Sequence, residues 1–135
     1  MKISKIVNLT PHALNFITVT ETGTSEHNGR PVSYAKEYDT LLTIESEGVA
    51  RAAQKRDSLP SVVIGDLELP CNRSSFGEPE GDLPSKPQDG VIYVVSQITA
   101  QAFKEQGRTE DIFIVDGLQR NAKGVPVGCT GLAKV

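Results

Sequence analysis

The stretch between residues 90 and 117, GVIYVVSQITAQAFKEQGRTEDIFIVDG, constrains the fold of this chain more than any other. Its beginning and its end are apolar runs, which are typical of strands buried on both faces of a sheet. Between them, apolar residues recur at helical spacing, with Ser96 placed as an N-cap and Gly107 placed to end the helix. A strand, a helix of about three turns and a second strand predict a βαβ unit with a right-handed crossover.

The rest of the chain is expected to form mostly antiparallel strands joined by tight turns. Alternating and β-branched residues predict strands over about residues 2–8, 13–20 and 40–46. The pair Asn28-Gly29 marks a turn inside a polar segment that we interpret as a hairpin or a mobile loop. A second hairpin is predicted across Gly65-Asp66, and a third in the C-terminal tail, turning at residues 121–124.

Two segments allow two interpretations each. Residues 47–57 contain alanines and long polar side chains that favour a helix, although their alternation favours a strand, which we prefer. In the segment NLTPH, Thr10 before Pro11 resembles the start of a helix. The β-branched residues that follow favour a strand with a proline kink instead, which would aim His12 at a loop.

The predicted fold is therefore a single α+β domain over residues 1–135. It contains a mixed, mostly antiparallel sheet with one C-terminal βαβ crossover helix and a C-terminal hairpin. A long loop is expected at about residues 70–89, because this segment is rich in proline, glycine and acidic residues and has no hydrophobic periodicity. Long ordered loops often carry function, so this loop is part of the candidate site.

The composition narrows the classes of partner. A formal net charge of -3 argues against binding of extended nucleic acid but permits a small anionic ligand in a locally basic pocket. The chain has neither a signal-peptide pattern nor an apolar run long enough to span a membrane, so we expect a cytoplasmic protein with no membrane partner. Cys71 and Cys129 lie far apart without other metal-type ligands, so no metal and no cofactor are expected.

The sequence contains no motif that identifies a catalysed reaction. It contains neither of the glycine-rich phosphate motifs, no G-x-S-x-G and no H-E-x-x-H. His12 could act as an acid or base, but no serine or cysteine is placed beside it in a recognisable nucleophile motif. Asp111 and Asp116 sit at opposite ends of one predicted strand and cannot form a carboxylate pair. Asp111 could instead cap the entry of the strand or pair with an arginine.

Six residues are the candidates for ligand binding. They are His12, Arg51, Arg73, Phe76, Ser96 and Arg120. Ser96 lies where a buried strand leads into a helix, a common position for ligands in α/β sheets, although an ordinary N-cap explains it equally. The arginines interrupt small or apolar stretches and suit phosphate groups, or else ion pairs with the many acids. We expect Arg51 and Arg73 to converge on the cleft where the crossover helix begins, with Phe76 stacking on the ligand and His12 at the rim.

Several segments together resemble one family of small proteins. The segments NLTPH, SEGVARA, NRSSFGEPEGDLPSKPQDGVIYVVSQITAQA and DIFIVDGLQRNAKGVPVGCTGL follow the running order of a family from bacteriophages, prophages and many bacteria. The resemblance covers nearly the whole chain and implies a phage context, but it assigns no catalytic residues. Where relatives carry RDD before the last strand, this chain carries RTED, starting at Arg108.

Three functions follow from these observations, in descending order. The first is a phage-type small-molecule binding protein that sequesters a nucleotide-like anionic signal of host defence. The second is a protein-interaction module that inhibits a host factor or assists assembly, as a homodimer or higher oligomer, because exposed sheet edges and long loops suit protein contacts. The third is a small enzyme that uses His12 as an acid or base.

Overall fold

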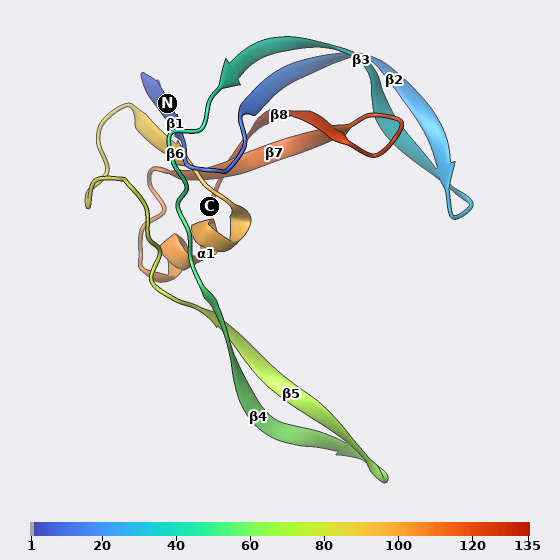
Figure 1. Cartoon of the computed structure of the whole chain (residues 1–135), viewed down its shortest axis with the longest axis vertical. Helices are drawn as coiled ribbons and strands as arrows, with labels where there is room; N and C mark the ends of the chain where they lie inside the picture. Colours follow the sequence, from blue (N-terminus) through green and yellow to red (C-terminus); the bar gives the residue numbers. More distant parts are fainter. Residues whose placement is uncertain (1) are drawn as a thin grey trace.

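The computed structural model describes residues 2–135 and contains one six-stranded sheet, one two-stranded sheet and the helix α1 (Figure 1). The elements, in chain order, are β1 (Lys5–Asn8), β2 (Leu14–His27), β3 (Arg30–Ile44), β4 (Gln54–Ile64), β5 (Leu67–Phe76), β6 (Val91–Val94), α1 (Gln97–Glu105), β7 (Ile112–Arg120) and β8 (Pro126–Lys134). The larger sheet has the strand order β1-β6-β7-β8-β2-β3, and β4 pairs with β5 in the smaller one.

The predicted βαβ unit is present. β6 and β7 run parallel, with Tyr93 opposite Ile112, and α1 connects them. The side-chain oxygen of Ser96 accepts a hydrogen bond from the Thr99 amide at 3.4 Å, as an N-cap does. At the other end Gly107 adopts a φ of 84°, a left-handed conformation that ends the helix and that glycine adopts without strain.

The larger sheet mixes parallel and antiparallel pairs, as expected for an α+β fold. Within the two sheets, three pairs are parallel and three are antiparallel, and the antiparallel pairs are the longer ones. The C-terminal hairpin of β7 and β8 turns where the sequence predicts it. There the Asn121 side chain accepts hydrogen bonds from the amides of Lys123 and Val125 at 2.9 and 3.1 Å.

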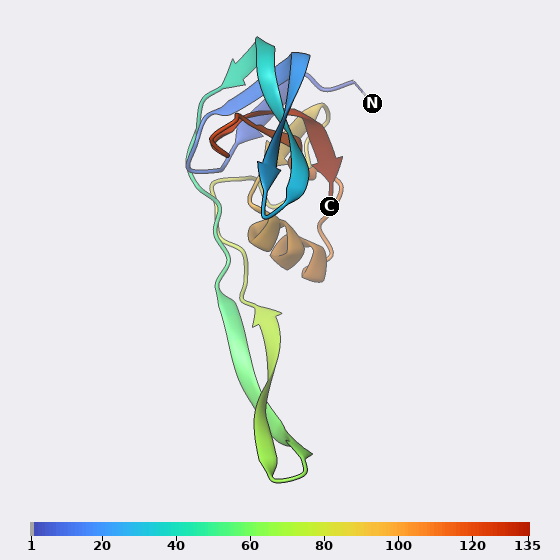
Figure 2. The ribbon, with the colours of Figure 1, turned by 90° about the vertical axis from the view of Figure 1, so that its right-hand side faces the viewer.

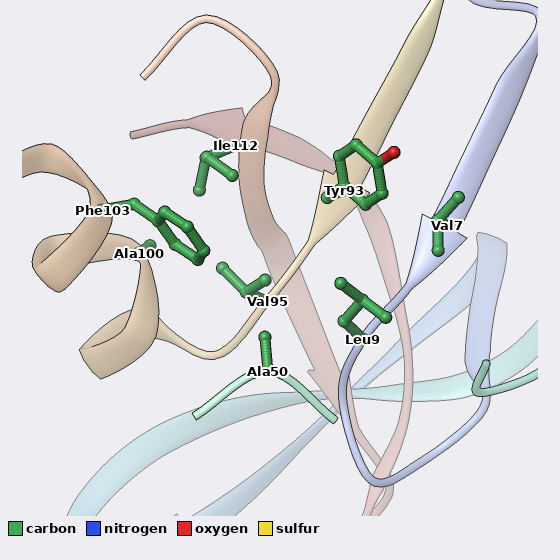
Figure 3. Packing of buried hydrophobic residues seen from close by; sticks show 8 residues of the cluster. All are labelled: Val7, Leu9, Ala50, Tyr93, Val95, Ala100, Phe103 and Ile112. Atoms are coloured by element: carbon green, nitrogen blue, oxygen red, sulfur yellow. The ribbon is translucent and has the colours of Figure 1, made fainter. Parts of the chain in front are cut away.

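The main hydrophobic core lies between α1 and the strands of the βαβ unit. Its buried members are Val7, Leu9, Ala50, Tyr93, Val95, Ala100, Phe103 and Ile112 (Figure 3). Ala100 and Phe103 on α1 point toward Val95 and Ile112 (Figure 3). Since the aliphatic and aromatic side chains of this cluster are nearly inaccessible to water, their burial is the chief source of stability here.

Two long hairpins extend the chain beyond this core. The first, formed by β2 and β3, turns at Asn28 and Gly29, whose φ angles are 52° and 75°. Of the two interpretations of this polar segment, hairpin and mobile loop, the hairpin is therefore correct, and it curves over the sheet (Figure 1). The second hairpin, formed by β4 and β5, turns at the predicted Gly65-Asp66 pair and projects away from the rest of the molecule in both views (Figures 1 and 2). We call this second hairpin the arm.

Two boundaries differ from the prediction. The loop expected at about residues 70–89 begins only after Phe76, because its first part is the second strand of the arm. The sequence predicts only the start of this strand, because the apolar alternation ends at Cys71 and the residues that follow are mostly polar and exposed. Residues 47–53 are largely irregular, with one bridge between Arg51 and Glu80, and the predicted strand begins only at Gln54. Among residues 2–135, no helix has the length and apolar character needed to cross a membrane.

Candidate functional site

The NLTPH segment is not the predicted kinked strand: after Asn8 it forms a tight loop between β1 and β2, organised by this buried asparagine. Asn8 is fully buried, and its amide nitrogen donates hydrogen bonds to the carbonyl oxygens of His12 and Ile44 at 2.7 and 3.1 Å. Its side-chain oxygen accepts bonds from the Thr10 amide and hydroxyl at 3.0 and 2.6 Å. The loop is thereby held to the end of β3, and the backbone of His12 is fixed although its ring is exposed. No candidate role was assigned to Asn8 from the sequence, although asparagine side chains often accept a hydrogen bond from the backbone two residues on, as Asn8 does from Thr10.

A cavity of about 710 Å³ opens beside this loop, at the carboxyl end of β6. The β1–β2 loop contributes His12, and the start of β2 contributes Leu14. The N-cap of α1 contributes Ser96, and the β7–β8 hairpin contributes Leu118 and Val127. The sequence predicts a ligand site at this position, and the structure brings His12 and Ser96 to one hollow. The lining of this cavity is mostly apolar, and the described residues that form it include no lysine or arginine. Its volume lies in the usual range for small-molecule sites.

A smaller hollow of about 360 Å³ adjoins the first one. Arg51 and Ser96 both line it, so Ser96 is shared by the two hollows. The backbone of Arg51 is held in place by two hydrogen bonds with Glu80, both 2.7 Å long, which fix the segment between β3 and β4 to the loop after β5. Within residues 2–135 the guanidinium of Arg51 makes no ion pair, and the side chain is exposed.

The expected convergence of Arg51 and Arg73 is wrong. Arg73 lies on β5, opposite Asp57 of β4, and borders neither of the two hollows. Phe76 is half-buried at the base of the arm, opposite Gln54, and does not line the hollows either. The physical reason is that β5 is one strand of a ribbon that projects from the body, and Arg73 lies on it three residues before the base at Phe76.

Arg120 also stays out of the site. Its guanidinium donates a hydrogen bond to the carbonyl oxygen of Gly124 at 2.9 Å, across the turn of the C-terminal hairpin. This bond satisfies a carbonyl of the turn and keeps the side chain on the hairpin. Of the six candidate residues, the structure therefore groups His12 with Ser96, and Ser96 with Arg51, and separates the other three.

Arg108 and Asp111 form a largely buried ion pair, which confirms that Asp111 pairs with an arginine. The two side chains form a bidentate pair, with nitrogen–oxygen distances of 3.0 and 2.8 Å, while Arg108 also donates to the carbonyl oxygen of Pro84 at 2.6 Å. The guanidinium lies 5.8 Å from the centre of the Phe103 ring. Hydrogen bonding to Asp111 raises the pKa of Arg108, and burial together with the Asp111 charge raises the pKa of Tyr93. These contacts order the α1–β7 loop and tie it to the loop between β5 and β6, which is a structural role.

The arm carries apolar side chains on one face. Residues opposite one another in the ribbon share a face, as do residues two apart along a strand. A bulge between Leu59 and Val62 keeps both of these residues on the same side. The face, which we call the apolar stripe, consists of Leu59, Val62, Ile64, Leu67, Leu69 and Cys71. Ile64 and Leu67, next to the turn, are 64% and 57% exposed.

The opposite face of the arm is mostly polar, with Val63 near the turn, Pro70 midway and Phe76 at the base as its apolar members. It presents pairs such as Ser58 with Asn72 and Arg56 with Ser74. No residue of β4 or β5 reaches full burial, whereas strands of the larger sheet contain several buried residues. The arm is thus an amphipathic ribbon whose apolar side has no cover within the described chain.

Comparison with known proteins adds no assignment to this geometry. No protein-family model matches the chain, and no curated protein and no solved structure shows significant similarity to it. Within residues 2–135, no group of three or more histidine, cysteine, aspartate or glutamate side chains is arranged to hold a metal ion. The features that bear on function are therefore the arm and the two hollows joined at Ser96.

Proposed function

We propose that this chain is a protein-interaction module and that the arm is its contact surface. The observation that carries the proposal is the exposed apolar stripe on a hairpin that projects from the body (Figure 2). In the sequence-based ranking this function came second. It now comes first, because the arginines that supported anion binding do not converge.

The physical argument concerns the stability of the arm. A two-stranded ribbon without a third layer is only marginally stable in water. Contiguous aliphatic side chains at the surface mark sites of association, and their full burial contributes about 1.5–3 kcal/mol each. A partner that covers Ile64 and Leu67 would therefore stabilise both the contact and the arm itself. Either a host protein or further copies of the chain fits the role expected of a phage-type protein.

A matched pair of variants tests this proposal. The arm variant carries Val62→Ser, Ile64→Thr and Leu67→Thr, which remove apolar surface but keep residues compatible with a strand. The control, Val125→Ser, changes a residue that is 52% exposed in the C-terminal hairpin. Each protein is immobilised through a C-terminal tag, and proteins retained from a lysate that also contains the untagged chain are identified and quantified by mass spectrometry.

We expect one stoichiometric protein, the chain itself or another, to be retained by the wild type and the control but not by the arm variant. Retention of the same protein by the arm variant would show that the arm is not the contact surface. Retention of nothing at stoichiometric amounts by the wild type would equally contradict the proposal.

A second candidate function is binding of a small molecule in the two joined hollows. The supporting observation is that Ser96 borders both the larger apolar cavity and the hollow that contains Arg51. A ligand with an apolar or ring-shaped part and one anionic group fits this arrangement, because the ring would fill the cavity while the anion faces Arg51. A nucleotide-like signal, sequestered without catalysis, belongs to this class.

Thermal-shift measurements with nucleotides and cyclic nucleotides test the second candidate. A ligand present at 100 times its dissociation constant should stabilise the wild type by about 2.7 kcal/mol. Arg51→Ala should weaken binding of the anionic ligand, whereas Arg73→Ala, which changes the arginine of the arm, should leave the shift intact. A panel without any shift, or an equal loss in both variants, would rule out this site.

A further inference from the structure

We infer that the tip of the arm, residues 62–69, inserts into the cavity of about 710 Å³ in a second copy of this chain, whose own arm enters the first copy in return. This inference rests on the proposed function, because it names the partner of the arm. Three observations support it: the arm cannot reach the cavity of its own chain, the tip and the cavity match in polarity and size, and each side of the contact carries an unpaired charge.

The arm of a chain lies out of reach of the cavity in the same chain. Its base is closed by the Gly77 amide, which donates a hydrogen bond to the carbonyl oxygen of Ala53 at 2.6 Å, and by the two bonds between Arg51 and Glu80. From this base β4 extends for 11 residues, roughly 36 Å at the usual rise per residue, and points away from the body (Figures 1 and 2). The tip can therefore enter a cavity only in another molecule.

The tip and the cavity match in polarity and in size. No lysine, arginine, aspartate or glutamate is among the described residues that line the cavity, so aliphatic side chains can enter it without burying a charge. The stripe residues of the tip, which are 40% to 64% exposed, are Val62, Ile64, Leu67 and Leu69. A cavity of about 150 Å³ holds one benzene molecule, so a cavity of about 710 Å³ has room for these four side chains, each with fewer carbon atoms than benzene. Glu68 lies on the opposite face of the arm and stays in water.

Each side of the contact also carries a charge that has no ion-pair partner within residues 2–135. Asp66 stands in the turn of the arm, between Ile64 and Leu67. Arg51 lines the hollow that adjoins the cavity at Ser96. A tip whose aliphatic side chains fill the cavity can place the Asp66 carboxylate at this hollow, opposite the Arg51 guanidinium. The end of the arm thus has the chemistry that the two joined hollows suit, an apolar group with one anion.

Reciprocal insertion closes a dimer. A two-fold axis through the midpoint between a chain's own tip and its own cavity brings each tip to the cavity of the other copy. The contact is then made twice, and neither an apolar tip nor a cavity is left to bind a third copy. Since the tip and a small molecule would occupy the same cavity, a small ligand would compete with the dimer.

Complementation between two defective variants gives the decisive experiment on the full-length protein. The arm variant, with Val62→Ser, Ile64→Thr and Leu67→Thr, keeps its cavity, and the cavity variant, Leu118→Arg, keeps its arm. Leu118 lines the cavity and is 48% exposed, so the body should tolerate the arginine. The control is Val125→Arg, at a position that is 52% exposed and outside the lining. Sedimentation equilibrium measures the association of each protein alone and of the equimolar mixture of the two defective variants.

We expect the wild type and the control to form a concentration-dependent dimer, and each defective variant alone to associate at least about tenfold more weakly, because aliphatic burial is lost. The mixture should form a heterodimer through the one intact arm and the one intact cavity, weaker than the wild-type dimer. Packing of one arm on another predicts no such recovery, since the arm variant would then have no contact surface. A mixture that associates no better than its components would overturn the inference.

Exchange of the two charges tests how the tip is oriented in the cavity. Asp66→Arg and Arg51→Asp each place like charges together, so each should weaken the dimer about tenfold. A chain that carries both substitutions restores an opposite pair and should recover the dimer. Recovery in the double variant supports the contact, whereas additive losses would overturn the pairing of Asp66 with Arg51.

The outcomes separate the inference from the function on which it rests. A wild type that stays monomeric while its arm retains a different protein would overturn the inference and leave the interaction module standing. A dimer that the three substitutions in the arm do not weaken would overturn both.

Discussion

The two long hairpins of this protein are built alike but end in different surroundings. Each has two long strands and a tight turn that contains glycine at positive φ. The β2–β3 hairpin buries Leu14, Ile17 and Ala35, whereas the arm buries no residue fully. Pairing register and turn residues are therefore enough to form a two-stranded ribbon, whereas the burial of its side chains depends on the elements packed against it.

The β2–β3 hairpin is held because the body offers it close contacts. β2 pairs with β8 at Phe16 and Cys129, and Asn8 bonds the end of β3. The approach is close at Gly128, where a Cβ atom would lie 2.7 Å from the carbonyl oxygen of Asn15. A glycine there lets β8 and β2 meet. The arm has no such neighbour within the described chain, so only an association could cover it.

The largest expected difference between the hairpins comes from a matched pair of isoleucines. Ile17 in β2 is 2% exposed and Ile64 in the arm is 64% exposed. Ile17→Ala should lower the free energy of unfolding by about 3 kcal/mol through lost burial and a cavity. Ile64→Ala should change it by less than about 0.5 kcal/mol in dilute solution. Urea denaturation measures both, and similar losses would mean that the arm packs on its own body.

We expect a smaller difference in the free energy of unfolding between two asparagine variants, one in the body and one in the arm. Asn8→Ala removes a side chain that bonds two carbonyl oxygens and the amide and hydroxyl of Thr10, at a cost of about 2 kcal/mol. Asn72→Ala, at an exposed position in the arm, should be nearly neutral. Thermal unfolding of both variants tests this. An Asn8 variant as stable as the wild type would mean that the NLTPH loop does not anchor the first hairpin.

The two cysteines should differ in reactivity at neutral pH. Burial raises the pKa of the Cys129 thiol, so the folded protein holds less of the reactive thiolate there. Cys71, half-buried on the arm, should react with a maleimide at least about tenfold faster. Mass spectrometry of partially labelled peptides measures the ratio. Labelling of Cys129 should increase as pH rises, because the thiolate then forms, and equal labelling at pH 7 would contradict the assigned burial.

The smallest expected effect comes from shortening the arm. Arg56 and Ser74 are opposite one another, so joining them through an Asn-Gly turn removes residues 57–73 without straining the base. The free energy of unfolding of the body should change by less than about 0.5 kcal/mol, measured by urea denaturation. Loss of cooperative unfolding would show that the arm belongs to the folding unit.

Local patterns were enough to predict much of the fold. The βαβ unit, the N-cap at Ser96 and the turns at Asn28 and Gly65 follow from short-range rules of periodicity and backbone conformation. The site was harder to predict. His12 and Ser96 meet because each follows the carboxyl end of one of two neighbouring parallel strands, β1 and β6. The position of Arg73 depended instead on the direction in which the paired strands of the arm project from the body.

The sequence by itself determined the elements whose signals are local, because helix caps, glycine turns and apolar runs act over a few residues. The strand at residues 70–76 was missed because its stability comes from pairing with β4 rather than from its own pattern. Only the tertiary structure decided which ribbon is covered, which arginine approaches Ser96 and which apolar face stays exposed. Those outcomes depend on contacts between segments far apart in the chain, and no local rule specifies such contacts.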